Sequence, residues 1–118
     1  MDKRARIFIA GHRGLAGSAI RKKFREEGYE NLIVRPRSQL DLTRFKDVEA
    51  FFQRERPDAV ILAAAKVGGI LANSTFPVEF LEVNLAIQQN VISAAASSGV
   101  EKLIFLGSSC IYPRNCAQ

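Results

Sequence analysis

The sequence predicts an α/β fold in which a parallel sheet is covered by helices on both faces. Short apolar runs alternate along the chain with segments whose apolar residues recur at helical spacing. A glycine-rich turn joins the first apolar run to the first of these segments, and no linker or repeat divides the chain. Strands that alternate with helices in this way pair in parallel, because each helix returns the chain to the same end of the sheet.

The four predicted strands are mainly apolar on both faces, as expected for strands buried within a parallel sheet. They comprise residues 6–10, 31–34, 59–65 and 102–106. The sequence ends a dozen residues after the last strand, so this strand is expected to have no covering neighbour.

Three helices are predicted, over residues 15–27, 41–56 and 78–98, and residues 68–77 are predicted to be a loop. Gly28 and Gly99 follow the first and third helices, as is typical of helix ends. The order of elements indicates a Rossmann-type doubly wound parallel sheet, which normally has about six strands. We therefore expect residues 1–118 to be its N-terminal portion, with about four strands.

The formal net charge of +5 arises entirely in the first half of the chain. Residues 1–60 carry 14 Lys and Arg against 9 Asp and Glu, whereas residues 61–118 carry 3 of each. The basic residues are not interleaved with aromatic ones, which favours a solvated surface over nucleic-acid binding. Neither a signal peptide nor an apolar run of about 20 residues is present, so we expect a cytoplasmic protein without membrane contact. Cys110 and Cys116 lack metal-ligand spacing, and no metal is expected.

The first functional motif is Gly-x-x-Gly-x-x-Gly, placed between a buried strand and an amphipathic helix. A helix N-terminus offers unpaired N–H groups and a favourable dipole to a pyrophosphate. Gly11 allows the sharp turn, Gly14 leaves room for phosphates, and Gly17 lets the helix approach the strand. The motif predicts a dinucleotide site formed by Gly11, His12, Arg13, Gly14, Leu15, Ala16 and Gly17.

The end of the second strand indicates which dinucleotide is bound. Enzymes specific for NAD place an acidic residue there to bind the ribose 2′-hydroxyl, whereas this chain has Arg35 and Arg37. Arginine can pair with a 2′-phosphate through two hydrogen bonds, and Arg13 can approach it from the glycine loop. Because strand residues alternate in direction, only one of Arg35 and Arg37 need face the cofactor. The pattern favours NADP.

Two further segments follow strands at the carboxyl edge of the sheet, where ligands bind in open α/β folds. Small residues in 63–69 would let a cofactor lie across this edge, with Ala63, Ala64 and Lys66 as contacts, although helix packing explains small residues nearly as well. Residues 107–113 contain two adjacent serine hydroxyls and a thiol that could polarise a carbonyl or carry a proton. Serine is equally a common turn residue.

Segments 9–20, 62–70 and 105–113, in this order, resemble the extended short-chain dehydrogenase/reductase family. The resemblance covers the whole chain. It implies NADP(H) as cofactor, GDP-4-keto-6-deoxy-D-mannose as a GDP-linked keto-deoxy sugar substrate, and a homodimer. It also implies further cofactor contacts at Arg37, Ser38, Gln39, Leu40, Asp41, Leu42, Leu106, Gly107, Ser108 and Ser109.

The resemblance implies catalytic roles as well. Ser108 matches a serine that hydrogen-bonds the sugar carbonyl during reduction, and Cys110 matches an acid/base in epimerisation, a role that suits a thiol of lowered pKa. Reduction in this family also uses a Tyr-x-x-x-Lys pair, but neither Tyr29 nor Tyr112 is followed by lysine four residues later. We therefore expect a cofactor-binding part without the substrate-binding domain, inactive alone.

Two other interpretations stay open. The chain could belong to another NADP-linked nucleotide-sugar epimerase or dehydratase, or be a non-catalytic module that binds a dinucleotide. The predicted helix 78–98 is apolar around much of its circumference. This suits either a dimer interface or a position inside the monomer core.

Overall fold

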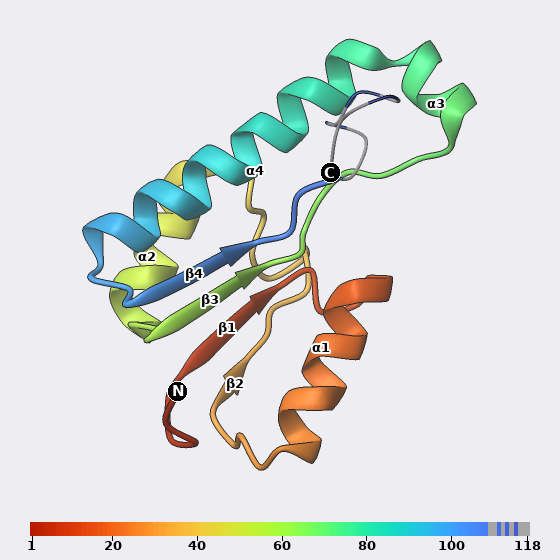
Figure 1. Ribbon diagram of the computed structural model, residues 1–118. Coiled ribbons are helices and arrows are strands. Elements are labelled where there is room, and N and C mark those ends of the chain that lie inside the picture. Colours follow the sequence, from red (N-terminus) through yellow and green to blue (C-terminus); the bar gives the residue numbers. More distant parts are fainter. Residues whose placement is uncertain (109–110, 112, 114, 116–118) are drawn as a thin grey trace.

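In a computed structural model that describes residues 1–108, 111, 113 and 115, four parallel strands form a sheet flanked by helices (Figure 1). The elements are β1 (Ile7–Ala10), α1 (Leu15–Glu26), β2 (Leu32–Ile33), α2 (Phe45–Glu55), β3 (Ala59–Leu62), α3 (Ile70–Thr75), α4 (Pro77–Ser97) and β4 (Lys102–Phe105). The predicted α/β fold is confirmed. Within the described residues, no helix is both long enough and apolar enough to cross a membrane.

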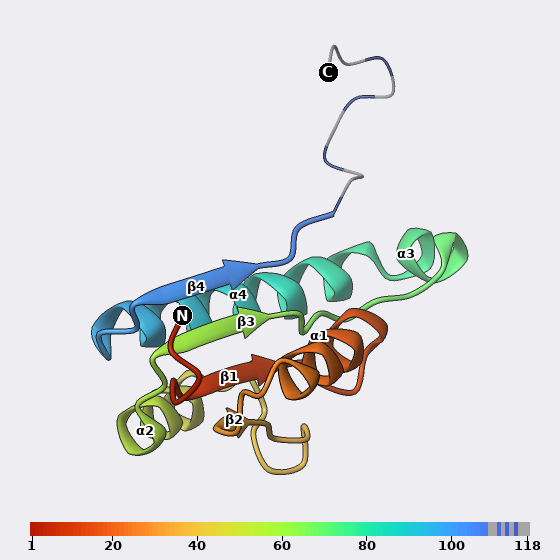
Figure 2. The ribbon, with the colours of Figure 1, turned by 60° about the horizontal axis from the view of Figure 1, so that its bottom comes forward.

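The strands lie side by side in the order β2-β1-β3-β4 (Figure 2). Ile7 of β1 pairs with Leu32 of β2 on one side and with Ala59 of β3 on the other. The chain therefore moves from β1 to one neighbour and then returns past β1 to the other. The carboxyl ends of β1 and β3 lie at this reversal, which is the position where open α/β sheets bind ligands.

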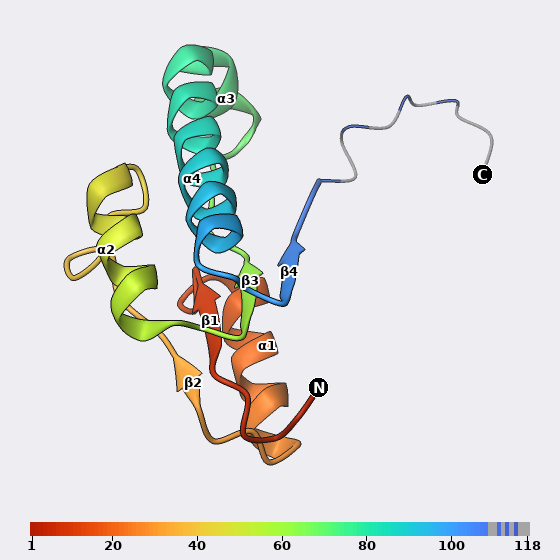
Figure 3. The ribbon, with the colours of Figure 1, turned by 90° about the vertical axis from the view of Figure 1, so that its left-hand side faces the viewer.

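The helices form two layers, with α1 on one side of the sheet and α2 and α4 on the other (Figure 3). Because side chains alternate along a strand, Ile7 and Ile9 pack in the α1 layer, whereas Phe8 packs in the layer of α2 and α4. The second layer contains a cluster of aromatic rings, in which Phe8 lies 4.6 Å from Phe51 between ring centres. This layer also supplies one side of the cavity described below.

The main differences between the predicted and observed elements lie at four places. β3 ends at Leu62, three residues before its predicted end at residue 65. β2 is limited to Leu32–Ile33, shorter than the predicted 31–34. α2 begins at Phe45 rather than at residue 41, because the Asp41 carboxylate accepts hydrogen bonds from the Thr43 N–H (3.0 Å) and hydroxyl (2.7 Å) and forms a turn. The stretch predicted as a loop contains α3.

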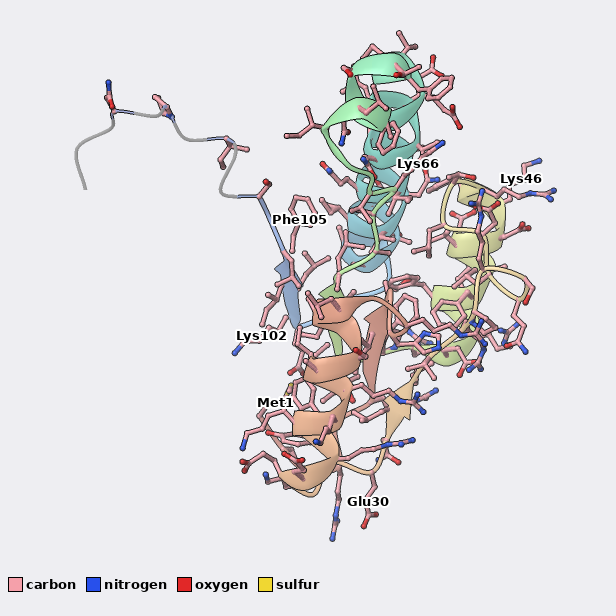
Figure 4. The ribbon with its side chains drawn as sticks, turned by 90° about the vertical axis from the view of Figure 1, so that its right-hand side faces the viewer. Met1, Glu30, Lys46, Lys66, Lys102 and Phe105 are labelled. Carbon is pink, nitrogen blue, oxygen red and sulfur yellow. The ribbon has the colours of Figure 1, made fainter. Side chains whose placement is uncertain are left out.

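β4 is the outermost strand of the sheet and is poorly covered. Ile104, Phe105 and Leu106 are 45%, 41% and 38% exposed, whereas all residues of β1 and β3 are buried. Figure 4 shows Phe105 on this open strand. The expectation of a last strand without a covering neighbour is confirmed for the described residues.

Candidate functional site

A cavity of about 580 Å³ opens at the carboxyl ends of β1 and β3. Its volume lies in the range of about 300–1,000 Å³ that is typical of ligand sites. Three loops and α4 line it, and the lining residues are Phe8, Ala10, Gly11, His12, Arg13, Gly14, Leu15, Ala16, Arg35, Pro36, Arg37, Leu40, Asp41, Leu42, Thr43, Ala63, Ala64, Ala65, Lys66, Val67, Val83 and Ile87.

The glycine loop between β1 and α1 owes its shape to close backbone contacts. Gly11 has a φ of +86°, and a Cβ on it would lie 2.6 Å from the Ala64 backbone nitrogen. A Cβ on Gly17 would overlap the Gly11 carbonyl oxygen. Glycine at both positions is therefore required by the fold, because a side chain would push apart three backbone segments.

Gly14 differs from the other two glycines of the loop. A Cβ there would meet only the Gly11 carbonyl oxygen, at an ordinary contact distance of 3.4 Å, and the backbone conformation is extended. The protein itself therefore has room for a side chain at Gly14. Because Gly14 lines the cavity, its missing side chain leaves space for a ligand.

The N-terminus of α1 points its first residues into the same cavity. Gly14, Leu15 and Ala16 line it, and among the described residues no side chain caps this helix and no acidic residue lies in its first turn. The first N–H groups of a helix have no partners within the helix, and they carry the positive end of its dipole. This corner of the cavity therefore has the N–H donors and the dipole direction that suit an anion.

The two arginines after β2 have different surroundings. Arg35 donates to Glu55 Oε1 at 2.9 Å and to the Val34 carbonyl at 2.8 Å, and its guanidinium lies 5.8 Å from the centre of the Phe51 ring. The Arg37 side chain is 80% exposed and has only a loose ion pair, 3.7 Å long, with Asp41. Arg37 is therefore the one whose guanidinium is accessible to a ligand.

Arg13 and His12 follow each other in the glycine loop but are placed differently. Arg13 is exposed and lines the cavity from the glycine loop, whereas Arg37 lines it from the loop after the neighbouring strand β2. His12 is buried. Burial, with added repulsion from Arg21 and Arg13, lowers the pKa of His12 and favours the neutral imidazole.

Asp41 lines the cavity wall that carries Arg37. Its pKa is lowered, first by the hydrogen bond from the Thr43 hydroxyl and then by the bond from the Thr43 N–H, with smaller contributions from Arg37 and Arg44. The carboxylate is thus occupied within its own loop and is stabilised in its charged form.

Lys66 turns its side chain from the cavity edge toward α4, as Figure 4 shows. Its ammonium group forms an ion pair with Glu79 and lies 5.1 Å from the centre of the Phe80 ring. The amine therefore binds α4, and the loop from Ala63 to Val67 contributes mainly backbone and small side chains to the cavity.

Most of the predicted cofactor residues meet in this cavity, but not all. Gly17 lies buried behind the loop. Leu106 donates its N–H to the Leu62 carbonyl at 3.0 Å and continues β4. The predicted residues that do not line the cavity are Gly17, Ser38, Gln39, Leu106, Gly107 and Ser108. Ser109 and Cys110 lie outside the described residues.

Several lining residues were not predicted, and the most important are Val83 and Ile87 of α4. Their spacing of four residues places both on one face of the helix. The same spacing is typical of core residues, so sequence alone could have marked the face but not its role. Thr43 was also missed, and the available signal was that it directly follows the predicted cofactor contacts at 37–42.

The family model of the NAD dependent epimerase/dehydratase family matches residues 7–118. The chain is 61% identical over 117 residues to GDP-L-fucose synthase 1 of Arabidopsis thaliana, covering 99% of this chain and 36% of that protein. Among solved structures, DdhaC superimposes with a TM-score of 0.96 at 50% identity, covering 99% of this chain and 34% of that one.

A GDP-mannoheptose C4 reductase from Campylobacter jejuni, with NADP bound, superimposes with a TM-score of 0.93 at 38% identity, covering 99% of this chain and 37% of that one. The chain therefore spans about a third of the length of the relatives it matches. Since the family model matches nearly all of its residues, the chain belongs to the NAD-dependent epimerase/dehydratase family.

Proposed function

We propose that residues 1–118 are the N-terminal, NADP(H)-binding part of an enzyme that converts GDP-4-keto-6-deoxy-D-mannose to GDP-L-fucose. The observation that carries the cofactor proposal is the cavity shared by the α1 N-terminus, Arg13 and Arg37. The helix end suits the pyrophosphate, and two accessible arginines from two neighbouring loops suit a 2′-phosphate. Support for the substrate comes from the relative named GDP-L-fucose synthase at 61% identity.

The bound cofactor would supply hydride to the sugar ketone. The Ser108 hydroxyl, which follows β4 at the carboxyl edge, would donate a hydrogen bond to the keto oxygen. Cys110 would exchange the proton on the carbon next to the ketone. The Tyr-x-x-x-Lys pair and the substrate-binding domain would come from sequence outside residues 1–118, so we propose that this chain alone does not turn over.

A second candidate is the reduction of a different GDP-linked keto sugar. The observation that favours it is the close superposition on a GDP-mannoheptose C4 reductase. In this case the cofactor site would be unchanged, and the difference would lie in the residues that contact the sugar. A non-catalytic dinucleotide-binding module is the remaining candidate.

One assay separates the three candidates. The longest protein product that contains this chain is mixed with NADPH and GDP-4-keto-6-deoxy-D-mannose, and NADPH absorbance and the sugar products are followed. Loss of NADPH with formation of GDP-L-fucose supports the first candidate. Turnover only with another GDP-linked keto sugar supports the second, and binding of NADPH without turnover of either sugar supports the third. Absence of binding contradicts all three.

The cofactor preference is tested by replacing Arg13 and Arg37 with alanine. Since a hydrogen bond to a charged group contributes about 1.5–3 kcal/mol, each change should raise the NADPH dissociation constant about 10- to 100-fold. The NADH constant should change little. Arg44→Ala is the matched control, because Arg44 is exposed on the same loop but does not line the cavity. Equal losses for both cofactors would contradict a 2′-phosphate site.

We also propose a homodimer through α4. Its outer face carries an exposed apolar stripe at helical spacing, formed by Val78, Leu81, Leu85 and Ile92. Leu81→Glu and Leu85→Glu together should shift the sedimentation coefficient of the longest product from dimer to monomer, whereas Gln53→Glu, at an exposed position of α2, should not. The cytoplasmic location stays a prediction from the sequence, which imaging of a tagged protein can test.

A further inference from the structure

α4 forms one side of the cavity through Val83 and Ile87. The same helix carries two asparagines close to these residues, Asn84 between them and Asn90 after Ile87. Asn84 is partly buried and Asn90 is only 8% exposed. A buried amide side chain is costly unless it is hydrogen-bonded, so the partners of these two side chains show what they hold in place.

Asn84 binds both backbone groups of Lys66. Its Oδ1 accepts from the Lys66 N–H at 2.7 Å, and its Nδ2 donates to the Lys66 carbonyl at 3.0 Å. One amide side chain thus replaces the two hydrogen bonds that a neighbouring strand would make, at a point where the loop has left β3. The neighbouring turn of α4 adds Glu79 and Phe80 against the Lys66 side chain.

Asn90 holds the opposite wall of the cavity. Its Nδ2 donates to the Leu42 carbonyl at 2.9 Å, across 48 positions of sequence. Leu42 lies in the loop between β2 and α2, next to Asp41 and on the wall that carries Arg37. The same helix is therefore tied to the loop after β2 and to the loop after β3.

We propose that Asn84 and Asn90 are positioning residues that fix the separation of the two loop walls around the dinucleotide. This inference rests on the proposed cofactor site. Both loops lack regular structure where they line the cavity, so without these anchors the ligand would have to order them on binding. Asn84 acts on the loop after β3, whereas Asn90 acts on the loop with Arg37. The two should therefore have different effects on cofactor choice.

The test uses the longest product that contains this chain, with variants Asn84→Ala, Asn84→Asp and Asn90→Ala. Gln89→Ala is the matched control, because Gln89 is an exposed amide on the same helix. Dissociation constants for NADPH and NADH are measured by calorimetry on the folded protein, with thermal melting measured alongside. Hydrogen exchange of the Lys66 amide is followed by NMR without ligand.

Asn84→Ala should raise the dissociation constants of NADPH and NADH equally, by about three- to tenfold, the size expected from loss of a hydrogen bond. It should also expose the Lys66 amide to exchange. Asn84→Asp keeps the acceptor but not the donor, so it should weaken binding while Lys66 stays protected. Asn90→Ala should weaken NADPH more than NADH, because its loop carries Arg37.

A purely structural role would lower the melting temperature and leave the dissociation constants of the folded protein unchanged, which would overturn the proposal. Unchanged Lys66 exchange in Asn84→Ala would overturn it as well. If Asn90→Ala does not fold, the two Asn84 variants still decide. A wild-type protein that binds neither cofactor contradicts the proposed function itself. This outcome differs from a failure of the proposal about Asn84 and Asn90, because the Lys66 amide of the wild-type protein would be protected from exchange although no cofactor binds.

Discussion

Two loops carry the arginines proposed to bind the 2′-phosphate, Arg13 in the glycine loop and Arg37 in the loop between β2 and α2. Different physical effects give these two loops their shapes. The glycine loop is set by missing side chains, since any Cβ on Gly11 or Gly17 would strike backbone. The loop between β2 and α2 is set by side-chain hydrogen bonds, among them Arg35 to Glu55 and Asn90 to Leu42. The glycines mark a loop of the first kind in the sequence, even though Gly11 packs against the distant Ala63–Ala64 backbone, whereas no residue type marks the partners of a loop of the second kind.

The largest effect on stability is expected from Gly17→Ala, which disrupts the glycine loop. The added methyl group would overlap the Gly11 carbonyl oxygen, and backbone cannot move aside as a flexible side chain can. We expect a loss of about 3 kcal/mol in the free energy of unfolding, measured by urea titration. Gly69→Ala is the control, because no described atom lies within 4 Å of a Cβ there. Equal stability of the two variants would refute the steric account.

Gly14→Ala should separate ligand space from protein packing in the same loop. The protein tolerates a Cβ at this position, so the unfolding free energy should fall by less than about 1 kcal/mol. The methyl group would occupy the corner of the cavity at the α1 N-terminus, and the NADPH dissociation constant should rise about tenfold or more. Calorimetry and urea titration on the same sample measure both. A large stability loss with unchanged affinity would mean that Gly14 serves the fold after all.

The sequence was sufficient to predict the glycine loop but not the loop between β2 and α2. Three glycines between a strand and a helix correctly predicted the turn between β1 and α1, because glycine is required there by the positive φ of Gly11 and by the backbone contacts at Gly11 and Gly17. The start of α2 was wrong, since Asp41 followed by Thr43 fits both a helix cap and the turn that forms. The roles of Asn84 and Asn90 could not be predicted, because their partners lie 18 and 48 positions away.

The missed helix α3 has a similar physical explanation. None of its residues is buried, so no apolar periodicity marks it in the sequence. The predicted strands, by contrast, were found because β1 and β3 are buried on both faces. Burial thus marked where β3 lies but not where it ends, because the apolar run continues through Ala63, Ala64 and Ala65 beyond the last strand residue, Leu62.

His12 tests the glycine loop through the pH dependence of the unfolding free energy. Its lowered pKa means that the folded protein disfavours the charged imidazole, whereas the unfolded chain takes up a proton near the ordinary value of about 6.5. The contribution of neutral His12 to stability is therefore complete above this pH and declines as pH falls below it. His12→Asn should flatten the dependence of the unfolding free energy on pH between about 6.5 and 5. An unchanged slope would place the acid sensitivity on other groups.

Asp41 tests the loop between β2 and α2 in the same way, through the pH dependence of stability, with a smaller effect in a different pH range. Its lowered pKa means that the charged carboxylate is stabilised by Thr43, so the contribution is complete above the ordinary value of about 3.9 and is lost as pH falls through the lowered pKa. Asp41→Asn should therefore cost less than about 1 kcal/mol at neutral pH, because the side chain is 30% exposed and solvent weakens the interaction. The difference between variant and wild type should shrink below about pH 4, and Thr43→Val should reproduce it. If the cost of Asp41→Asn stayed constant down to acid pH, the carboxylate charge would not be what holds this turn, and the contrast between the two loops would rest on Asn90 and Arg35 alone.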